Sequence, residues 1–236
     1  MKFVLLLARV QRNLFEKTFF RMKKTILLLA LGSFLLTGCP KHEIIPAPTP
    51  HVELEADFLG TINGTPVELH QNVNGYYNDA LKTKIILPSP TPSSAVYSAD
   101  MKSSSSLVSI KIKLGSVYFD AAVAQDPSLQ VWKDFFLAND DPDDPNYAAG
   151  GNDGFELVYR DGTGAVWTSD EAIPGTVKFT NVVQESDESG DYVKFTCTFD
   201  CNVYRDVPDD TTPDPNDFIT ISLPIQDAVF VGYFKR

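Results

Sequence analysis

Residues 194–204 read KFTCTFDCNVY, and this stretch shows the pattern that decides the fold. Five apolar side chains alternate here with polar ones: Phe195, Cys197, Phe199, Cys201 and Val203. Successive residues of a β-strand point to opposite faces of a sheet, so this period of two predicts a strand with one buried and one solvated face. We therefore expect an antiparallel β-protein whose core includes these apolar residues.

Shorter stretches of the same kind recur from residue 53 onward. They cover residues 108–114, 155–159, 177–181, 219–223 and 229–233. Asn63-Gly64 and the sequence DGTG at 161–164 lie between such stretches and are typical of hairpin turns, and we expect a further turn at Gln226-Asp227. About ten short strands with polar turns predict an all-β fold, either an antiparallel β-sandwich or an open barrel.

One segment breaks the alternation. Leu129, Trp132 and Phe136 fall on one face of a helix, and Asp126-Pro127 suits a helix N-terminus. The sequence predicts one short helix over residues 128–137, packed on the sheets. Residues 89–95 and 103–106 are rich in Ser and Pro and are expected to be loops. Because no repeat or internal linker is visible, we expect residues 53–236 to form a single β-sandwich domain.

The N-terminal region has the layout of a targeting segment. After Met22, two lysines precede an apolar run that is shorter than the about 20 residues of a membrane-spanning helix. Residues 22–38 therefore predict a secretory signal peptide. Leu36-Thr37-Gly38-Cys39 resembles the bacterial lipobox, which predicts cleavage between Gly38 and Cys39 and lipid attachment to Cys39.

Two segments beside the signal peptide are expected to lie outside the fold. Residues 1–21 precede a signal that has its own methionine, so we interpret them as an upstream extension with the true start at Met22. Residues 39–52 combine the lipidated cysteine with a tether that contains four prolines, which favour an extended spacer. This layout predicts a lipid anchor in the bacterial cell envelope. Pro40 gives no retention signal of the aspartate type, which favours the outer membrane.

Composition and motifs narrow the function classes. The formal net charge is −11, which argues against a nucleic-acid partner because a phosphate backbone needs a basic surface. No GxSxG, HExxH or nucleotide-binding glycine motif occurs, so we expect no catalytic residues and no cofactor. Cys197 and Cys201 lie four residues apart on one predicted strand, which is too far for a disulfide. We expect them to be buried thiols.

Acidic loops are weak candidates for a metal site. Ca²⁺ prefers oxygen ligands, and one loop contains Asp140, Asp141, Asp143 and Asp144. Prolines interrupt this loop and a similar one over residues 206–217, and neither has the spacing of a Ca²⁺ loop. The alternative is a pair of solvated loops whose turns are set by Pro, Asp and Asn. Asp210-Thr211-Thr212 resembles an O-glycosylation site of Bacteroidota, which makes Thr211 a candidate for that modification.

Tyrosines supply the candidate ligand contacts. Tyr76, Tyr77 and Tyr147 lie in loop-like sequence and are expected to be exposed, where they can stack on sugar rings or contact a partner. The leading hypothesis is a non-catalytic, lipid-anchored module that binds a glycan or an envelope protein. One alternative is a glycan hydrolase, which needs two carboxylates in a cleft. Another is a structural or assembly subunit, which needs an exposed apolar patch or an open sheet edge.

The order of these motifs resembles a group of small β-sandwich lipoproteins of Bacteroidota. The motifs that carry the resemblance are the NGT hairpin at 63–65, the aromatic helix, DGTGAVWTS at 161–169, KFTCTF at 194–199, and a closing hairpin from ITISL at 219–223 to FVGYFKR at 230–236. The resemblance implies a β-sandwich on the outer membrane. Members of the group mostly lack an assigned activity, so it implies no catalytic residue.

Overall fold

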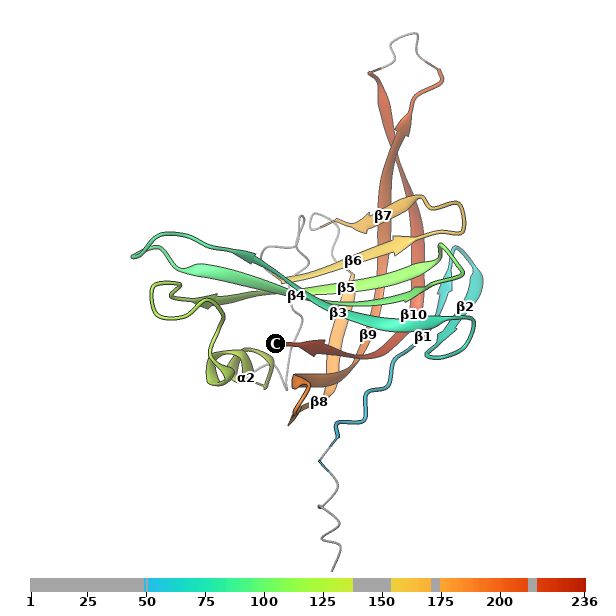
Figure 1. The fold of residues 1–236 in the computed structure, drawn as a ribbon. Coiled ribbons are helices and arrows are strands. Elements are labelled where there is room, and N and C mark those ends of the chain that lie inside the picture. Colours follow the sequence, from blue (N-terminus) through green and yellow to red (C-terminus); the bar gives the residue numbers. More distant parts are fainter. Residues whose placement is uncertain (1–48, 50, 138–153, 171–174, 212–215) are drawn as a thin grey trace, which may run out of the picture. The chain divides into compact units, whose positions relative to one another are not determined.

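A computed structural model describes residue 49 and residues 51–137, 154–170, 175–211 and 216–236. Pro50–Arg236 form one compact unit, shown in Figure 1. Its strands are β1 (Asp57–Ile62), β2 (Thr65–His70), β3 (Tyr76–Ile85), β4 (Ser93–Ser103), β5 (Ser109–Phe119), β6 (Gly154–Arg160), β7 (Val166–Ser169), β8 (Thr176–Asp187), β9 (Gly190–Pro208) and β10 (Phe218–Lys235), and its helix is α2 (Leu129–Leu137). The predicted all-β, antiparallel fold with one short helix is confirmed.

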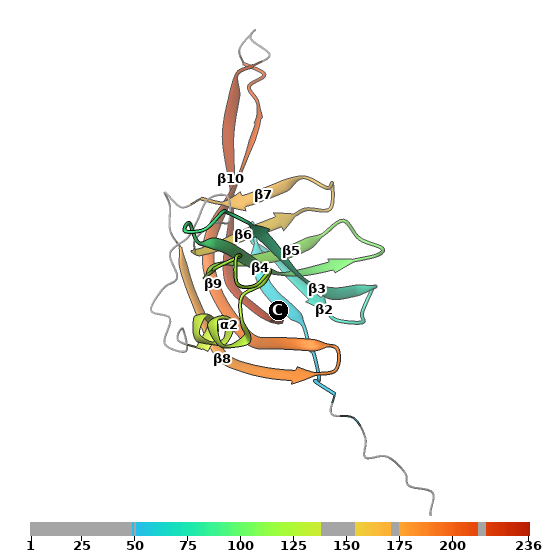
Figure 2. The same cartoon turned by 60° about the vertical axis from the view of Figure 1, so that its left-hand side comes forward.

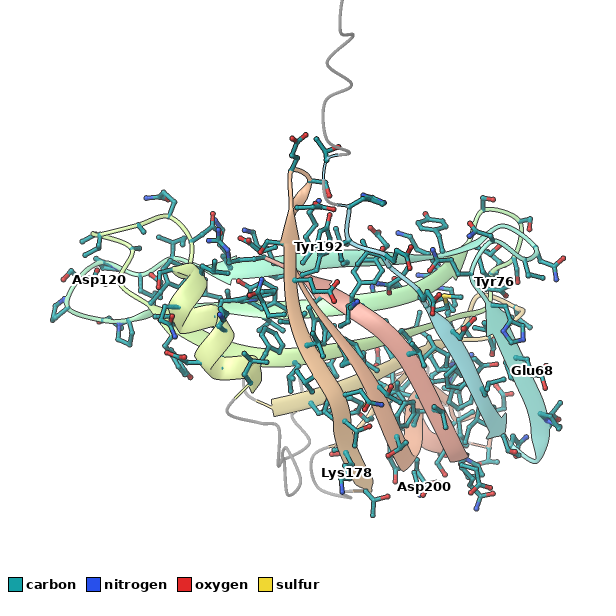
Figure 3. All side chains as sticks on the ribbon, turned by 90° about the horizontal axis from the view of Figure 1, so that it is seen from below. Glu68, Tyr76, Asp120, Lys178, Tyr192 and Asp200 are labelled. Carbon is teal, nitrogen blue, oxygen red and sulfur yellow. The ribbon has the colours of Figure 1, made fainter. Side chains whose placement is uncertain are left out.

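The ten strands form one antiparallel sheet that curls back on itself. Their order is β2-β1-β10-β9-β7-β6-β5-β4-β3, and β8 pairs with β9 outside this path. The first half of β9 pairs with β8, whereas Val203 and Tyr204 pair with β7. Because one edge of β9 passes from β8 to β7 in this way, β3 to β7 form one layer, and β1, β2, β8, β9 and β10 form the other. The two layers face each other, as Figures 1 and 2 show. Figure 3 shows Tyr76 and Asp120 at opposite ends of the β3–β5 layer.

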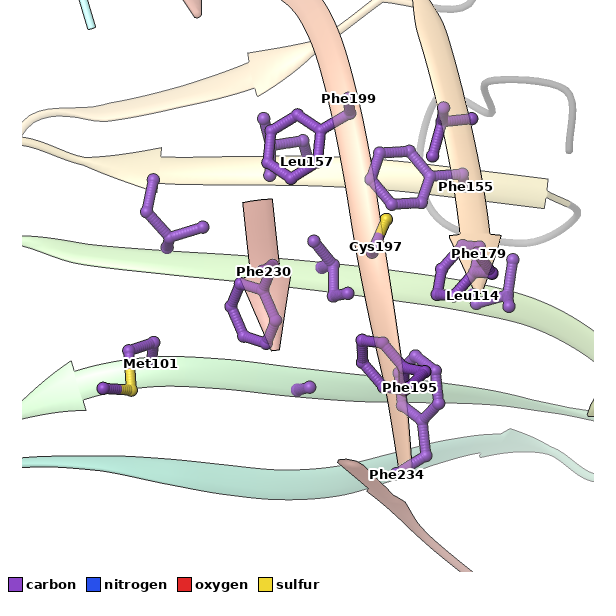
Figure 4. Close-up of a cluster of buried hydrophobic side chains, with 14 of the residues drawn as sticks. Met101, Leu114, Phe155, Leu157, Phe179, Phe195, Cys197, Phe199, Phe230 and Phe234 are labelled. Atoms are coloured by element: carbon purple, nitrogen blue, oxygen red, sulfur yellow. The ribbon is translucent and has the colours of Figure 1, made fainter. Parts of the chain in front are cut away.

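The core lies between the two layers and is rich in phenylalanine (Figure 4). The five alternating residues of β9 that the sequence predicts to be buried are all at most 8% exposed. Phe155 of β6 joins the layers, since its ring centroid lies 5.9 Å from Phe199 and 6.1 Å from Phe179 of β8. Each fully buried side chain of this size stabilises the fold by about 1.5–3 kcal/mol relative to exposure.

The predicted turns are partly right. Asn63 and Gly64 form the β1–β2 turn with φ values of 49° and 74°, which Asn-Gly adopts readily. The DGTG hairpin between β6 and β7 is also confirmed. The turn predicted at Gln226-Asp227 is wrong, because β10 continues through these residues and pairs with β9 on both sides of them. They form a β-bulge, which uses residues similar to those of a turn but only bends the strand.

Two predicted loops and a predicted cap also need correction. Residues 93–95 belong to β4, whose inward side chains include Ala95 and Ala99, and alanine and serine give a weak strand signal. Ser103 is the last residue of β4, so the loop starts after it. The helix cap is Ser128, whose hydroxyl accepts the Val131 N–H at 3.2 Å. Asp126 instead forms ion pairs with two lysines of β3.

Helix α2 closes one end of the core through two aromatic side chains. Trp132 and Phe136 are buried, and the ring of Trp132 lies 5.9 Å from that of Tyr97 on β4. The ring of Phe136 stacks on Phe234 of β10 at 5.0 Å. The helix therefore contacts strands from both layers.

The first described residues are held by the β8–β9 hairpin. The Val52 N–H donates to Asp187 Oδ2 at 2.9 Å, and His51 Nδ1 lies 3.3 Å from the same oxygen. Hydrogen bonds from the Ser189 hydroxyl and from Val52 hold the pKa of Asp187 well below its usual range. This carboxylate therefore fixes the point at which the chain enters the fold.

We expect Trp132→Ala to lower the free energy of unfolding by about 3–5 kcal/mol, because it removes a large, fully buried ring. Val131→Ala is the matched control, since Val131 is 41% exposed on the same helix and its loss should cost less than about 1 kcal/mol. Urea unfolding of both variants measures the difference. Equal losses would contradict docking of α2 through Trp132.

Candidate functional site

A polar groove of about 360 Å³ lies on the outer face of the β4–β7 layer. Asp100, Lys111 and Val158 are direct cross-strand neighbours on β4, β5 and β6, and their side chains alternate with core residues. The groove is lined by Asp100, Lys102, Ser103, Ser106, Leu107, Ser109, Lys111, Val158, Arg160 and Val166. It lies at the end of the layer that Tyr76 marks in Figure 3.

One wall of the groove is the serine run that follows β4. The hydroxyls of Ser103 and Ser105 donate to the Asn74 carbonyl oxygen at 2.7 and 2.8 Å. Gly75 has a φ of +71°, and a Cβ at this position would lie 2.6 Å from the Ser104 hydroxyl. The close approach of the two loops therefore requires glycine, and it fixes the serine hydroxyls at the groove.

The other wall is the β6–β7 hairpin, which Asp161 organises. Its Oδ1 accepts the N–H groups of Thr163 and Ala165 at 2.9 and 3.0 Å and the Thr163 hydroxyl at 2.6 Å. Its Oδ2 accepts the indole N–H of Trp167 at 3.1 Å. These hydrogen bonds, that of the Thr163 hydroxyl foremost, lower the pKa of Asp161 to about 2. They fix the turn between Arg160 and Val166, which both line the groove.

The described lining residues include three cations and one carboxylate. Lys111 Nζ lies 3.1 Å from Asp100 Oδ2. Lys102 is bonded to Asp79, which raises the pKa of the lysine and keeps it charged. Arg160 is exposed, and its guanidinium forms no ion pair with any described residue. Among the described lining residues, Arg160 is therefore the one cation without a carboxylate partner.

Asp100 offers an unused acceptor in the same groove. The residue is 6% exposed, and its Oδ1 has no hydrogen-bond partner among the described residues. A buried acceptor without a donor costs about 1–3 kcal/mol. This oxygen is itself buried, so a ligand hydroxyl can satisfy it only where the covering side chains move aside, while Lys111 holds the other carboxylate oxygen.

The structure places the three predicted tyrosines differently. Tyr77 is 43% exposed, as predicted, and Lys102 Nζ lies 5.6 Å from its ring centroid, so Tyr77 borders the groove. The prediction for Tyr76 is wrong. It is the first residue of β3 and points inward, where it is 8% exposed. Tyr147 lies outside the described residues.

The remaining predicted sites have mixed outcomes. Asp140, Asp141, Asp143 and Asp144 lie outside the described residues, as do Gly38 and Cys39. Within the described ranges, no group of three or more His, Cys, Asp and Glu side chains could hold a metal ion. Thr211 is exposed after β9, and its hydroxyl donates to Asp209 at 2.6 Å.

The two cysteines of β9 are buried, and in the described structure no disulfide joins them, as predicted. Burial raises the pKa of the Cys197 thiol, which makes it unreactive. The part of the chain that the structure describes contains no helix with the length and apolarity needed to cross a bilayer.

Sequence reasoning missed the groove itself, although Tyr77 at its border was a candidate. The available signal was the polar half of the alternation in β5, where Ser109 and Lys111 point away from the core. Without the strand order, nothing in the sequence brings these residues beside Asp100 and Arg160. In comparisons with known proteins, no family model, no curated protein and no solved structure matches the chain.

Asp161 predicts a pH dependence. Its pKa in the folded protein lies below the ordinary value, so the carboxylate stabilises the fold fully above pH about 4, and this contribution is lost as the pH falls through about 2. We expect the urea midpoint of the wild type to fall over this range and that of Asp161→Asn to fall less. Thr211 bonds to Asp209 in a similar local turn, so Asp209→Asn is a control from outside the groove. An equal response of wild type and Asp161→Asn would contradict the assignment.

Proposed function

We propose that this protein is a lipid-anchored module of the bacterial cell envelope that binds a glycan and catalyses no reaction. The groove is the observation that carries the proposal. It combines serine hydroxyls, cations and the buried, unpartnered acceptor of Asp100 with apolar contacts from Leu107 and Val166. Sugars present hydroxyls around apolar C–H surfaces, so a site of mixed polar and apolar lining suits them. Tyr77 at the border can stack on a ring.

The number of carboxylates in the groove and their ion pairs favour binding over hydrolysis. Glycoside hydrolysis uses two carboxylates that flank the scissile bond. Among the described lining residues, Asp100 is the one carboxylate, and its Oδ2 is held by Lys111. Glu156 lies on the same face but is 2% exposed and bonded to Lys113, so it supports the sheet rather than a substrate.

The proposed location rests on the N-terminal sequence. A signal peptide over residues 22–38, the lipobox at Cys39 and the proline-rich segment to residue 52 together support a lipid anchor. The absence of an aspartate after Cys39 supports the outer membrane.

We expect Cys39→Ser to abolish incorporation of an alkyne-labelled fatty acid and to move the protein out of the membrane fraction, because no thiol remains at the predicted lipidation position. In-gel fluorescence after labelling measures the change. Cys201→Ala is the control and should keep the label, since Cys201 is buried in the core. Label that persists in Cys39→Ser would contradict the anchor.

A glycan array probed with the full chain in mild detergent tests the binding function. We expect Tyr77→Ala to weaken the saccharide signal by about tenfold, because one stacked aromatic ring is removed. Tyr118→Ala is the matched control, since Tyr118 is 51% exposed near the opposite end of the layer and should leave the signal unchanged. A signal equally reduced in both variants would place the ligand elsewhere.

One observation favours a second candidate function, that of an assembly subunit. β3 is the last strand in the sheet order, and three apolar side chains in or just after its second half are exposed, namely Leu81 at 50%, Ile85 at 44% and Ile86 at 48%. A partner strand could add to such an edge. A photo-crosslinker placed at Leu81 should then capture a specific envelope protein, and a crosslinker at Val183 on β8 should not. Equal labelling at both positions would contradict this role.

A further inference from the structure

We infer that the groove selects acidic oligosaccharides, in which carboxylate groups occur beside hydroxyls. The inference rests on the proposed glycan-binding function and names the class of its ligand. Two side chains of opposite charge carry it, namely Arg160 at one end of the groove and Asp100 at the other.

Arg160 is the cation that remains available to a ligand. Lys111 is paired with Asp100, and Lys102 is paired with Asp79, whereas the exposed guanidinium of Arg160 forms no ion pair with any described residue. Guanidinium groups bind carboxylates through two parallel hydrogen bonds. Ser109 and Val166 are the direct cross-strand neighbours of Arg160, so they place a hydroxyl and an apolar contact beside the bound carboxylate.

Asp100 excludes ligands that are anionic but carry no hydroxyl. Its Oδ1 is buried, has no hydrogen-bond partner among the described residues and can only accept a hydrogen bond, so a simple anion would be repelled there. A ligand hydroxyl donates to this oxygen and removes the cost of an unsatisfied buried acceptor. The ligand must therefore present an acid to Arg160 and a hydroxyl donor to Asp100.

The spacing of these two residues sets the size of the ligand. Asp100 is on β4 and Arg160 on β6, and the pairing registers place them two residues apart along the strands. Their backbones are thus about 10 Å apart across the sheet and about 7 Å apart along it. The Arg160 side chain covers part of this distance, so a ligand of one or a few linked sugar rings fits between the two residues.

Charge outside the groove strengthens the selectivity. The protein carries a net charge of −11, so most of its surface repels an acidic chain. Screening limits that repulsion to about 10 Å at ordinary ionic strength. Arg160, the lining cation that forms no ion pair with any described residue, therefore decides where an acidic ligand can bind in the groove.

The test uses two probes with the same backbone, tetragalacturonic acid and its methyl ester, titrated calorimetrically into the full-length protein in mild detergent. We expect the acid to bind at least about tenfold more tightly than the ester, since a charge-assisted pair is lost on esterification. Arg160→Gln should remove this preference. Lys178→Gln, which removes an exposed cation on β8, should retain the preference.

Asp100→Ala, which removes both the charge and the acceptor oxygens, separates hydroxyl recognition from simple attraction of anions. If the groove only attracts negative charge, removal of the carboxylate strengthens binding of the acid. If Asp100 accepts a ligand hydroxyl, as we infer, the affinity for both probes falls by about tenfold. Thermal unfolding shows whether the variant is folded. The exposed Arg160 variant tests the inference even if Asp100→Ala is unstable.

The outcomes distinguish the inference from the function on which it rests. If neither these probes nor the glycan array gives binding, the glycan-binding function is overturned. Equal binding of acid and ester overturns the acidic ligand class alone. A preference for the acid that survives Arg160→Gln overturns the assignment to this groove.

Discussion

The fold depends on one strand, β9, that pairs with strands of both layers. β9 pairs with β10 along nearly its whole length, while its other edge pairs first with β8 and then with β7. The alternation of Phe195 to Val203 continues through the change of partner, so the same face of the strand stays buried throughout. A register slip of one residue would expose this face. The bulge at Gln226-Asp227 lets β10 bend with β9, and the sheet curls into two layers as a result.

The same curvature explains where a binding groove can form. The inner faces of the layers are filled by aromatic side chains, so the space available to a ligand is on an outer face. There the outward residues of β4, β5 and β6 include Asp100, Lys111 and Arg160, and the loops at the Tyr76 end lie beside them. The Ser103–Asn74 contact and the Asp161 turn hold these loops. The groove is thus a product of loop packing on a rigid sheet, and its lining does not need to contribute to the core.

The strands with strong alternation, the Asn-Gly and DGTG turns and the short helix could all be predicted from the sequence. Their signals are local, since they depend on side-chain period and turn chemistry. The predictions for Tyr76 and for residues 93–95 failed because flanking Ser, Asn and Gly residues conceal the start of a strand. The turn at Gln226-Asp227 failed because a bulge and a hairpin share residue preferences. The groove could not be predicted because it requires the pairing of Asp100 with Lys111 and of Ser109 with Arg160, which only the strand order supplies.

The contact of Asp187 with His51 and Val52 has a mechanical consequence. Tension applied through the N-terminal segment reaches this carboxylate before it reaches β1, so the β8–β9 hairpin shares the load. Behind it, β1 is bonded to β2 on one edge and to β10 on the other, and a pull along its axis strains both ladders together. Because the pKa of Asp187 is lowered, this contact persists to a lower pH than one made by an ordinary aspartate. The point at which the chain enters the fold therefore stays anchored to the β8–β9 hairpin at a pH that would protonate an ordinary aspartate.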